Sequence, residues 1–212
     1  SIASAGLSRS VRLAEPVQVP RLYSSSDPLA SLPDADKIAL LQRIETIARG
    51  LEHRKIVRVM PNMPAMVGRA LSAYSPNPEC RDADIAIVEK VLTSFGQAVR
   101  VAEKSLNAIT GLSGSGPAYV YLFIEAMVEA GITAGLPHDI ARKCAVQTII
   151  GSALMAEKTG KTPSELKLSV MSPGGTTAQG LAVLEENGFK SAVIKAVMAA
   201  TRRAEELGKA SG

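Results

Sequence analysis

Two glycine-rich segments contain the residues of this sequence that are best suited to binding a small ligand. The first, Thr110–Tyr119 (TGLSGSGPAY), holds three glycines, two serines and a proline, and an apolar run follows it directly. Glycine lets the backbone approach another molecule closely, and proline suits the first turn of a helix. The segment therefore predicts a tight loop that leads into a long helix. On this pattern alone, a plain helix-entry turn without a ligand is an equally good interpretation.

The second segment, Ser172–Thr177 (SPGGTT), also precedes a predicted helix. The hydroxyls of Ser172, Thr176 and Thr177 can donate hydrogen bonds to a carboxylate, as can the backbone N–H groups that follow the two glycines. The start of a helix leaves N–H groups unpaired and carries a partial positive charge, so it favours an anionic or polar ligand. A small carboxylic acid suits such a site, and no acid–base side chain is needed if a cofactor carries the chemistry.

Other kinds of site find little support in the sequence. His53 and His138 are its two histidines, and no spacing joins them to acidic residues or cysteines, so no metal site is predicted. The sequence Gly-Ser-Gly-Pro differs from the Gly-x-Ser-x-Gly motif of serine hydrolases. Cys80 and Cys144 indicate neither a disulfide framework nor a zinc site, which fits a reducing cytosol.

The composition narrows the class of protein. Apolar residues make up 46% of the chain and aromatic residues 3%, so the core must be built from small aliphatic side chains, which favours closely packed helices. The net charge of +4 comes from scattered Lys and Arg, with few aromatic rings for base stacking, which argues against nucleic-acid binding. No apolar run reaches the roughly 18 residues of a membrane span, and the N-terminus lacks the apolar core of a signal peptide. The sequence therefore predicts a cytoplasmic protein that contacts neither nucleic acid nor a membrane.

The elements that must position the two segments differ between the halves of the chain. The first half mixes helices and strands: helices are predicted over 37–49 and 81–95, and strands over 55–60, 67–75 and 97–102. After residue 103 only helices are predicted: 116–134, 137–158, one starting at 162, 177–187 and 190–207. The helix over 137–158 is apolar nearly all round, so it must be buried on every side. A domain of this size rarely covers such a helix alone, and a second subunit is therefore expected, with a dimer as the minimum assembly.

Four blocks of the sequence resemble the pyrroline-5-carboxylate reductases. They are RVMPN at 58–62, AITGLSGSGPAY at 108–119, AGLP at 134–137 and SPGGTT at 172–177. The blocks fall in the family's order and spacing over residues 55–209, and together they are specific. The resemblance implies an enzyme that reduces 1-pyrroline-5-carboxylate to L-proline, the last step of proline biosynthesis, with hydride from NADPH or NADH.

The resemblance also implies a fold. Residues 1–103 would be an α/β remnant of a Rossmann-type nucleotide-binding domain. Residues 104–212 would form an all-α dimerisation and substrate-binding domain that interlocks with a partner's, so the chain would be mainly α overall. The implied partners are the small-molecule substrate and product, pyrroline-5-carboxylate and proline, and further copies of the chain in a homodimer or higher homo-oligomer.

Carried over residue by residue, the resemblance implies roles for individual side chains. The implied substrate-binding residues are Glu103, Ser172, Gly175, Thr176 and Thr177. Of these, Thr177 would also lie near the ring nitrogen, as the catalytic residue, whereas Glu103 by its pattern alone is an ordinary surface carboxylate. The implied cofactor-binding residues are Met60, Pro61, Asn62 and Ser169. Two positions depart from the family, because Met63 replaces a usual threonine and Ser169 stands where some members have asparagine.

The largest departure is at the front of the sequence. The family begins with a strand and a loop resembling G-x-G-x-x-G, whose backbone N–H groups bind the pyrophosphate. Only Gly6 and Gly50 occur before residue 55. We therefore expect a truncated or internally deleted nucleotide domain, or a sequence from which residues are omitted, and weak NADPH binding by these 212 residues alone. The alternative function is a non-catalytic dimeric helical scaffold that keeps the substrate pocket but lacks a working cofactor site.

Overall fold

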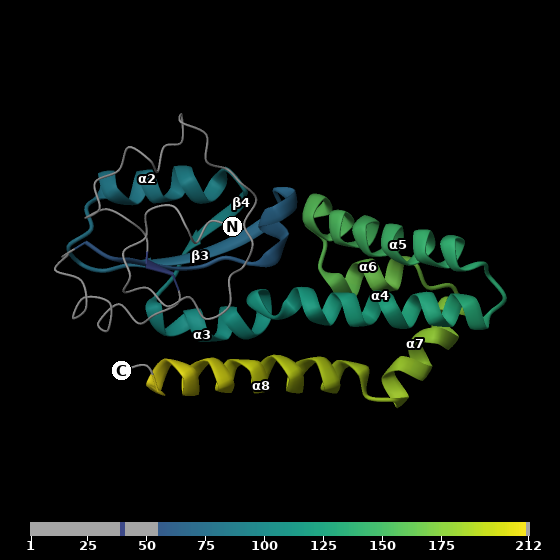
Figure 1. Cartoon of the computed structure of the whole chain (residues 1–212). Coiled ribbons are helices and arrows are strands. Elements are labelled where there is room, and N and C mark those ends of the chain that lie inside the picture. Colours follow the sequence, from purple (N-terminus) through teal and green to yellow (C-terminus); the bar gives the residue numbers. More distant parts are fainter. Residues whose placement is uncertain (1–38, 41–54, 211–212) are drawn as a thin grey trace. The chain divides into compact units, whose positions relative to one another are not determined.

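The computed structural model of the chain describes residues 39–40 and 55–210, which form two compact units (Figure 1). The first unit takes in the described residues up to Pro117 and those from Ala196 onward, and the second unit is Ala118–Lys195. The predicted domains, residues 1–103 and 104–212, stay a prediction.

A four-stranded sheet forms the base of the first unit, in the order β1-β2-β3-β4. The strands are β1 (Ala39–Leu40), β2 (Val57–Met60), β3 (Ala70–Pro76) and β4 (Gly96–Arg100). The outer pairs β1–β2 and β3–β4 are parallel, and the central pair β2–β3 is antiparallel. The strands predicted over 55–60, 67–75 and 97–102 are confirmed, with small shifts at their ends.

The helix predicted over residues 37–49 is wrong at Ala39–Leu40. Those two residues form a strand, paired with Arg58 and Val59 of β2. The run Ile38 to Leu41 is apolar throughout, and a short apolar run does not distinguish a strand from a buried helix by its periodicity. The rest of that predicted helix, and residues 1–36, lie outside the described residues.

Helix α2 (Asp82–Thr93) packs on one face of the sheet, and α3 (Leu106–Ile109) lies on the other (Figure 1). The core between α2 and the sheet contains three side chains of the helix and three of the strands: Ile85, Val88, Leu92, Val57, Val59 and Tyr74. Tyr74 donates its hydroxyl to the carboxylate of Glu89, and burial together with this bond raises the pKa of Tyr74 to about 12. The phenol therefore stays protonated and acts as a structural donor.

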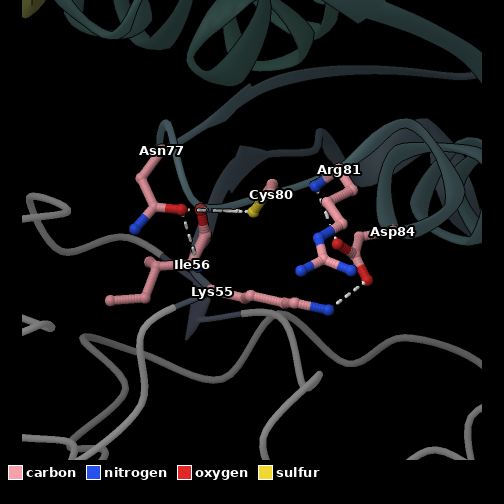
Figure 2. Close-up of polar contacts among 6 residues, drawn as sticks. All are labelled: Lys55, Ile56, Asn77, Cys80, Arg81 and Asp84. Atoms are coloured by element: carbon pink, nitrogen blue, oxygen red, sulfur yellow. Dashed lines mark hydrogen bonds and ion pairs between the residues drawn. The ribbon is translucent and has the colours of Figure 1, made fainter.

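A polar network holds the start of β2 against the start of α2 (Figure 2). The Ile56 N–H donates to Oδ1 of Asn77 at 3.1 Å, and the Cys80 thiol donates to the same oxygen at 3.2 Å. Nearby, the Lys55 ammonium lies 2.8 Å from Oδ1 of Asp84 and holds the pKa of that carboxyl below its usual value. Burial raises the pKa of the Cys80 thiol, so this cysteine serves as a hydrogen-bond donor and not as a nucleophile.

The glycine-rich segment 110–119 is not a loop, contrary to the prediction. The chain runs as a nearly continuous helix through η4 (Glu103–Ser105), α3 (Leu106–Ile109), η5 (Thr110–Gly114) and α4 (Gly116–Thr133). Segment η5 is a π-helical turn, in which the Ser115 N–H donates to the Thr110 carbonyl at 2.8 Å. Its glycines do not have positive φ; Gly111 instead permits close contact with helix α8 (Phe189–Ala210), since a Cβ at 111 would lie 2.7 Å from the Val197 carbonyl oxygen.

The second unit consists of helices only, as predicted. It contains most of α4, then α5 (His138–Thr159), α6 (Pro163–Ser169), α7 (Thr176–Glu186) and the first part of α8. The capping pattern predicted at residue 162 is present, because the Glu165 N–H donates to Thr162 Oγ1 and the Thr162 N–H donates to the Glu165 carboxylate. None of the helices in the described residues is long and apolar enough to cross a membrane.

The apolar side chains of this second unit are largely exposed in the single chain. Helix α4 has no buried residue, and α5 buries only Ala141 and Ala145. Large apolar side chains with more than half of their surface exposed include Leu122, Met155 and Val183. Apolar side chains exposed to this extent favour association with another molecule.

Candidate active site

Two sequence blocks that lie far apart in the chain meet in the first unit. Met60 is the last residue of β2, and Pro61 and Asn62 follow it directly. The Asn62 carboxamide accepts a hydrogen bond from the Leu71 N–H at 3.0 Å and donates to the Ser113 hydroxyl at 3.0 Å. A Cβ at Gly114 would lie 2.5 Å from the terminal methyl of Met60, so this glycine leaves room for the methionine. The loop after β2 and the π-helical turn η5 are therefore in direct contact.

Glu103 belongs to the same unit, where its carboxylate faces a cation of the protein itself. Nη1 of Arg58 lies 3.4 Å from Oε1 of Glu103, and Nη2 lies 3.4 Å from Oδ1 of Asn107. Only 12% of the Arg58 side chain is exposed, against 34% for Glu103. This arrangement joins β2 to the start of the helical run, and the role of Glu103 towards a substrate stays a prediction.

The segment SPGGTT forms the predicted helix start in the second unit. Helix α7 begins at Thr176, Gly175 is its N-cap, and no side chain caps it. The Gly175 N–H donates to the Ser172 carbonyl at 2.9 Å, and a Cβ at 175 would lie 2.2 Å from the Ser172 hydroxyl. Because no side chain caps the helix start, its first N–H groups are available to an anion, and the roles of Thr176 and Thr177 towards that anion stay predictions.

Ser169 lies in the same unit, at the C-terminal end of α6. Its side chain is exposed, and its hydroxyl donates to the Leu166 carbonyl at 2.8 Å, a bond within the helix. The structure thus places the predicted residues in two groups: Met60, Pro61, Asn62 and Glu103 in the first unit, and Ser169, Ser172, Gly175, Thr176 and Thr177 in the second.

Prediction from sequence missed the partners of these residues. The sequence indicates no role for Arg58, Asn107, Leu71 or Ser113. Arg58 stands inside the RVMPN block and Ser113 inside the block at 108–119, and these two blocks are the available signals. The other contacts join residues 9 to 51 positions apart in the sequence, and no local pattern marks them.

The residues after β2 fit the nicotinamide end of NAD(P)H, whereas the chain offers no glycine loop for the pyrophosphate. No charged residue occurs from Val59 to Gly68, and the side chains of Met63 and Met66 are about half exposed, so a flat uncharged ring can pack there. Among the described residues, no group of three or more His, Cys, Asp or Glu is placed to hold a metal ion.

An α/β unit of Rossmann type joined to an all-helical dimerisation domain defines the class of protein, and comparisons with known proteins agree. The family model described as "Pyrroline-5-carboxylate reductase dimerisation" matches residues 103–207. The pyrroline-5-carboxylate reductase of Synechocystis sp. is 47% identical over 169 residues, which are 80% of this chain and 62% of that protein. The Escherichia coli enzyme is 44% identical over 167 residues, 78% of this chain and 62% of that protein.

A solved structure supports the same assignment. The Plasmodium falciparum pyrroline carboxylate reductase, crystallised with NADP bound, superposes with a TM-score of 0.77 and 36% identity, over 82% of this chain and 72% of that one. The chain belongs to the pyrroline-5-carboxylate reductase family. It spans 62% of the length of the Synechocystis and E. coli relatives. The predicted fold class, mainly helical with an α/β part of Rossmann type, is confirmed.

Proposed function

We propose that this chain forms the substrate-binding and dimerisation part of a pyrroline-5-carboxylate reductase, which reduces 1-pyrroline-5-carboxylate to L-proline with NADPH or NADH. The observation that carries the proposal is the helix start of α7, which no side chain caps and whose first two residues are Thr176 and Thr177. The substrate is a small ring with one carboxylate, and this helix start supplies N–H donors and a partial positive charge for that group.

The residues of this chain bind and orient the reactants. The N–H groups at the start of α7, with Ser172 and Thr176, hold the carboxylate. The Thr177 hydroxyl lies near the ring nitrogen and helps to keep a proton there, while Glu103 contributes an acid on the substrate side. Met60, Pro61 and Asn62 present an uncharged surface to the nicotinamide, with Ser169 as a further cofactor contact. A bound reduced nicotinamide supplies the hydride, and holding the two rings in contact contributes much of the rate.

We further propose that the protein works in the cytoplasm as a homodimer or higher homo-oligomer, without nucleic acid. The exposed apolar surfaces of α4 and α5 support association with a second copy. One observation favours the alternative of a non-catalytic scaffold for these 212 residues by themselves, because the stretch before residue 55 has only two glycines and no phosphate loop.

The variant Thr177→Ala tests the carboxylate site. We expect it to weaken proline binding by about 1–3 kcal/mol without abolishing it, because the hydroxyl is lost while the backbone donors remain. Calorimetry with proline measures the difference. Thr133→Ala is the matched control, since its hydroxyl bonds only within α4, to the Glu129 carbonyl. Equal affinity of the Thr177 variant and the unchanged chain would remove Thr177 from the site.

The reductase function is tested by NADPH oxidation with pyrroline-5-carboxylate, followed by the absorbance of reduced nicotinamide. We expect the 212 residues alone to turn over little or not at all. A second protein, in which a complete strand–glycine loop–helix unit is grafted ahead of Lys37, should be active. The grafted unit restores the N–H donors that bind the pyrophosphate. Proline binding without turnover in the grafted protein would favour the scaffold. Robust turnover by the 212 residues alone would show that the cofactor binds without a glycine loop.

A further inference from the structure

The side chain of Asn62 makes its hydrogen bonds to other residues of the protein. Its Nδ2 donates to the hydroxyl of Ser113 at 3.0 Å and to the carbonyl of the same residue at 3.3 Å. Its Oδ1 accepts from the Leu71 N–H at 3.0 Å. Both acceptors of this nitrogen thus belong to Ser113, in η5. This side chain therefore joins three segments of the first unit: the loop after β2, strand β3 and the π-helical turn η5.

The segment to which Asn62 is attached is itself held in place. The Ser115 N–H closes the π-helical turn on the Thr110 carbonyl, and Gly111 packs directly against α8 near Val197 and Thr201. Just before the loop 60–62, the Arg58 guanidinium donates hydrogen bonds to Glu103 and Asn107. The loop thus lies between two anchored points, and π-helical turns within α-helices are often found at functional sites.

We propose that Asn62 is a positioning residue of the reductase site: its carboxamide ties the loop 60–62 to η5 and thereby fixes the backbone surface that receives the nicotinamide. Asn62 acts in this role through the loop and makes no contact with the reacting atoms. The inference rests on the proposed function, because it concerns the same nicotinamide surface.

The chemistry of the amide makes this role specific. Aspartate has nearly the same shape and keeps an oxygen for the Leu71 N–H, but it loses the amide nitrogen that donates to Ser113. In addition, it would place a carboxylate oxygen opposite the Ser113 carbonyl, where two acceptors repel each other. Ser113→Ala is the milder change, because it removes the hydroxyl and leaves the carbonyl acceptor.

The test uses the 212-residue chain with nicotinamide mononucleotide as the probe, since this half of the cofactor does not need the glycine loop. Amide hydrogen exchange at Ser115 reports whether the π-helical turn opens, and titration reports the Kd of the probe. We expect Asn62→Asp to speed the exchange and to raise the Kd about tenfold, and Ser113→Ala to act in the same direction more weakly. Asn187→Asp is the matched control, because it also removes an amide donor from a backbone carbonyl, that of Val183 at the end of α7; it should change neither quantity.

A pH titration adds a readout that a purely structural role would not move. In Asn62→Asp the carboxyl regains a donor when it is protonated, so the Kd should return towards that of the unchanged chain as the pH falls through its pKa. Unchanged exchange in both the Asn62 and Ser113 variants would disprove the attachment. Faster exchange with an unchanged Kd would disprove the positioning role. If the unchanged chain does not bind the probe at all, the nicotinamide surface in the proposed function is wrong, and the positioning role with it, while exchange still reports the attachment itself.

Discussion

Replacing Ile150 by aspartate should leave the chain monomeric. Ile150 lies in α5, and 45% of its surface is exposed in the single chain, where only two residues of that helix are buried. A charge is therefore tolerated at this position in an isolated subunit, but a partner that covers α5 would bury it without a counter-charge. An unpaired buried charge costs about 3–5 kcal/mol, so the dissociation constant of the dimer should rise by roughly three orders of magnitude.

Light scattering at micromolar concentration measures this effect. The matched control is Arg142→Asp, which places the same carboxylate on the same helix at an exposed position that is already charged. We expect the unchanged chain and the control to be dimers or larger, and the Ile150 variant to be folded by circular dichroism but dissociated. A persistent dimer in the Ile150 variant would exclude α5 from the interface. A stable folded monomer of the unchanged chain would contradict the proposed assembly as a whole.

The second large effect is expected from Gly111→Ala. A Cβ at this position would lie 2.7 Å from the Val197 carbonyl oxygen and 2.9 Å from the Thr201 nitrogen. Both are backbone atoms of α8, so no side-chain rotation relieves the contact, and the helix itself must move away from η5. Overpacking of this kind costs typically about 1–3 kcal/mol, and we expect the upper end of that range here because two backbone atoms are involved.

Urea unfolding gives the difference in stability, and Gly116→Ala supplies the control. Gly116 begins α4 in the same helical run, and a Cβ there meets no atom within 4 Å. Alanine is the better helix former, so this change should be neutral or slightly stabilising. If Gly111→Ala and Gly116→Ala have the same stability, the close packing of η5 on α8 does not exist in solution.

Much of this fold could be predicted from the sequence because it depends on local order. The 3.6-residue and two-residue periods reflect how side chains project from helices and strands, so α2, α5, β2 and β3 were found close to their true bounds. The start of α7 is predicted by another local signal. A Gly-Gly-Thr-Thr run after a proline favours a helix start whatever surrounds it. The need of α5 for a covering partner is also predicted from the sequence, since a helix that is apolar nearly all round needs cover that one small domain does not supply.

The tertiary structure decided what the glycines and polar side chains contact. A glycine-rich run can mean a turn or close packing, and the structure shows a π-helical turn at 110–114 whose Gly111 packs against α8. A short apolar run can be helix or strand, and only its pairing with Arg58 and Val59 makes Ala39–Leu40 a strand.

The same holds for the candidate site. The pairing of Arg58 with Glu103 and of Asn62 with Ser113 joins residues 45 and 51 positions apart. Local periodicity does not indicate which residues so far apart in the sequence come into contact, because these contacts depend on the tertiary packing of the whole chain. The residue types at the site were therefore determined by the sequence, whereas the choice of partner for each of them was made only by the packing of the helices against the sheet.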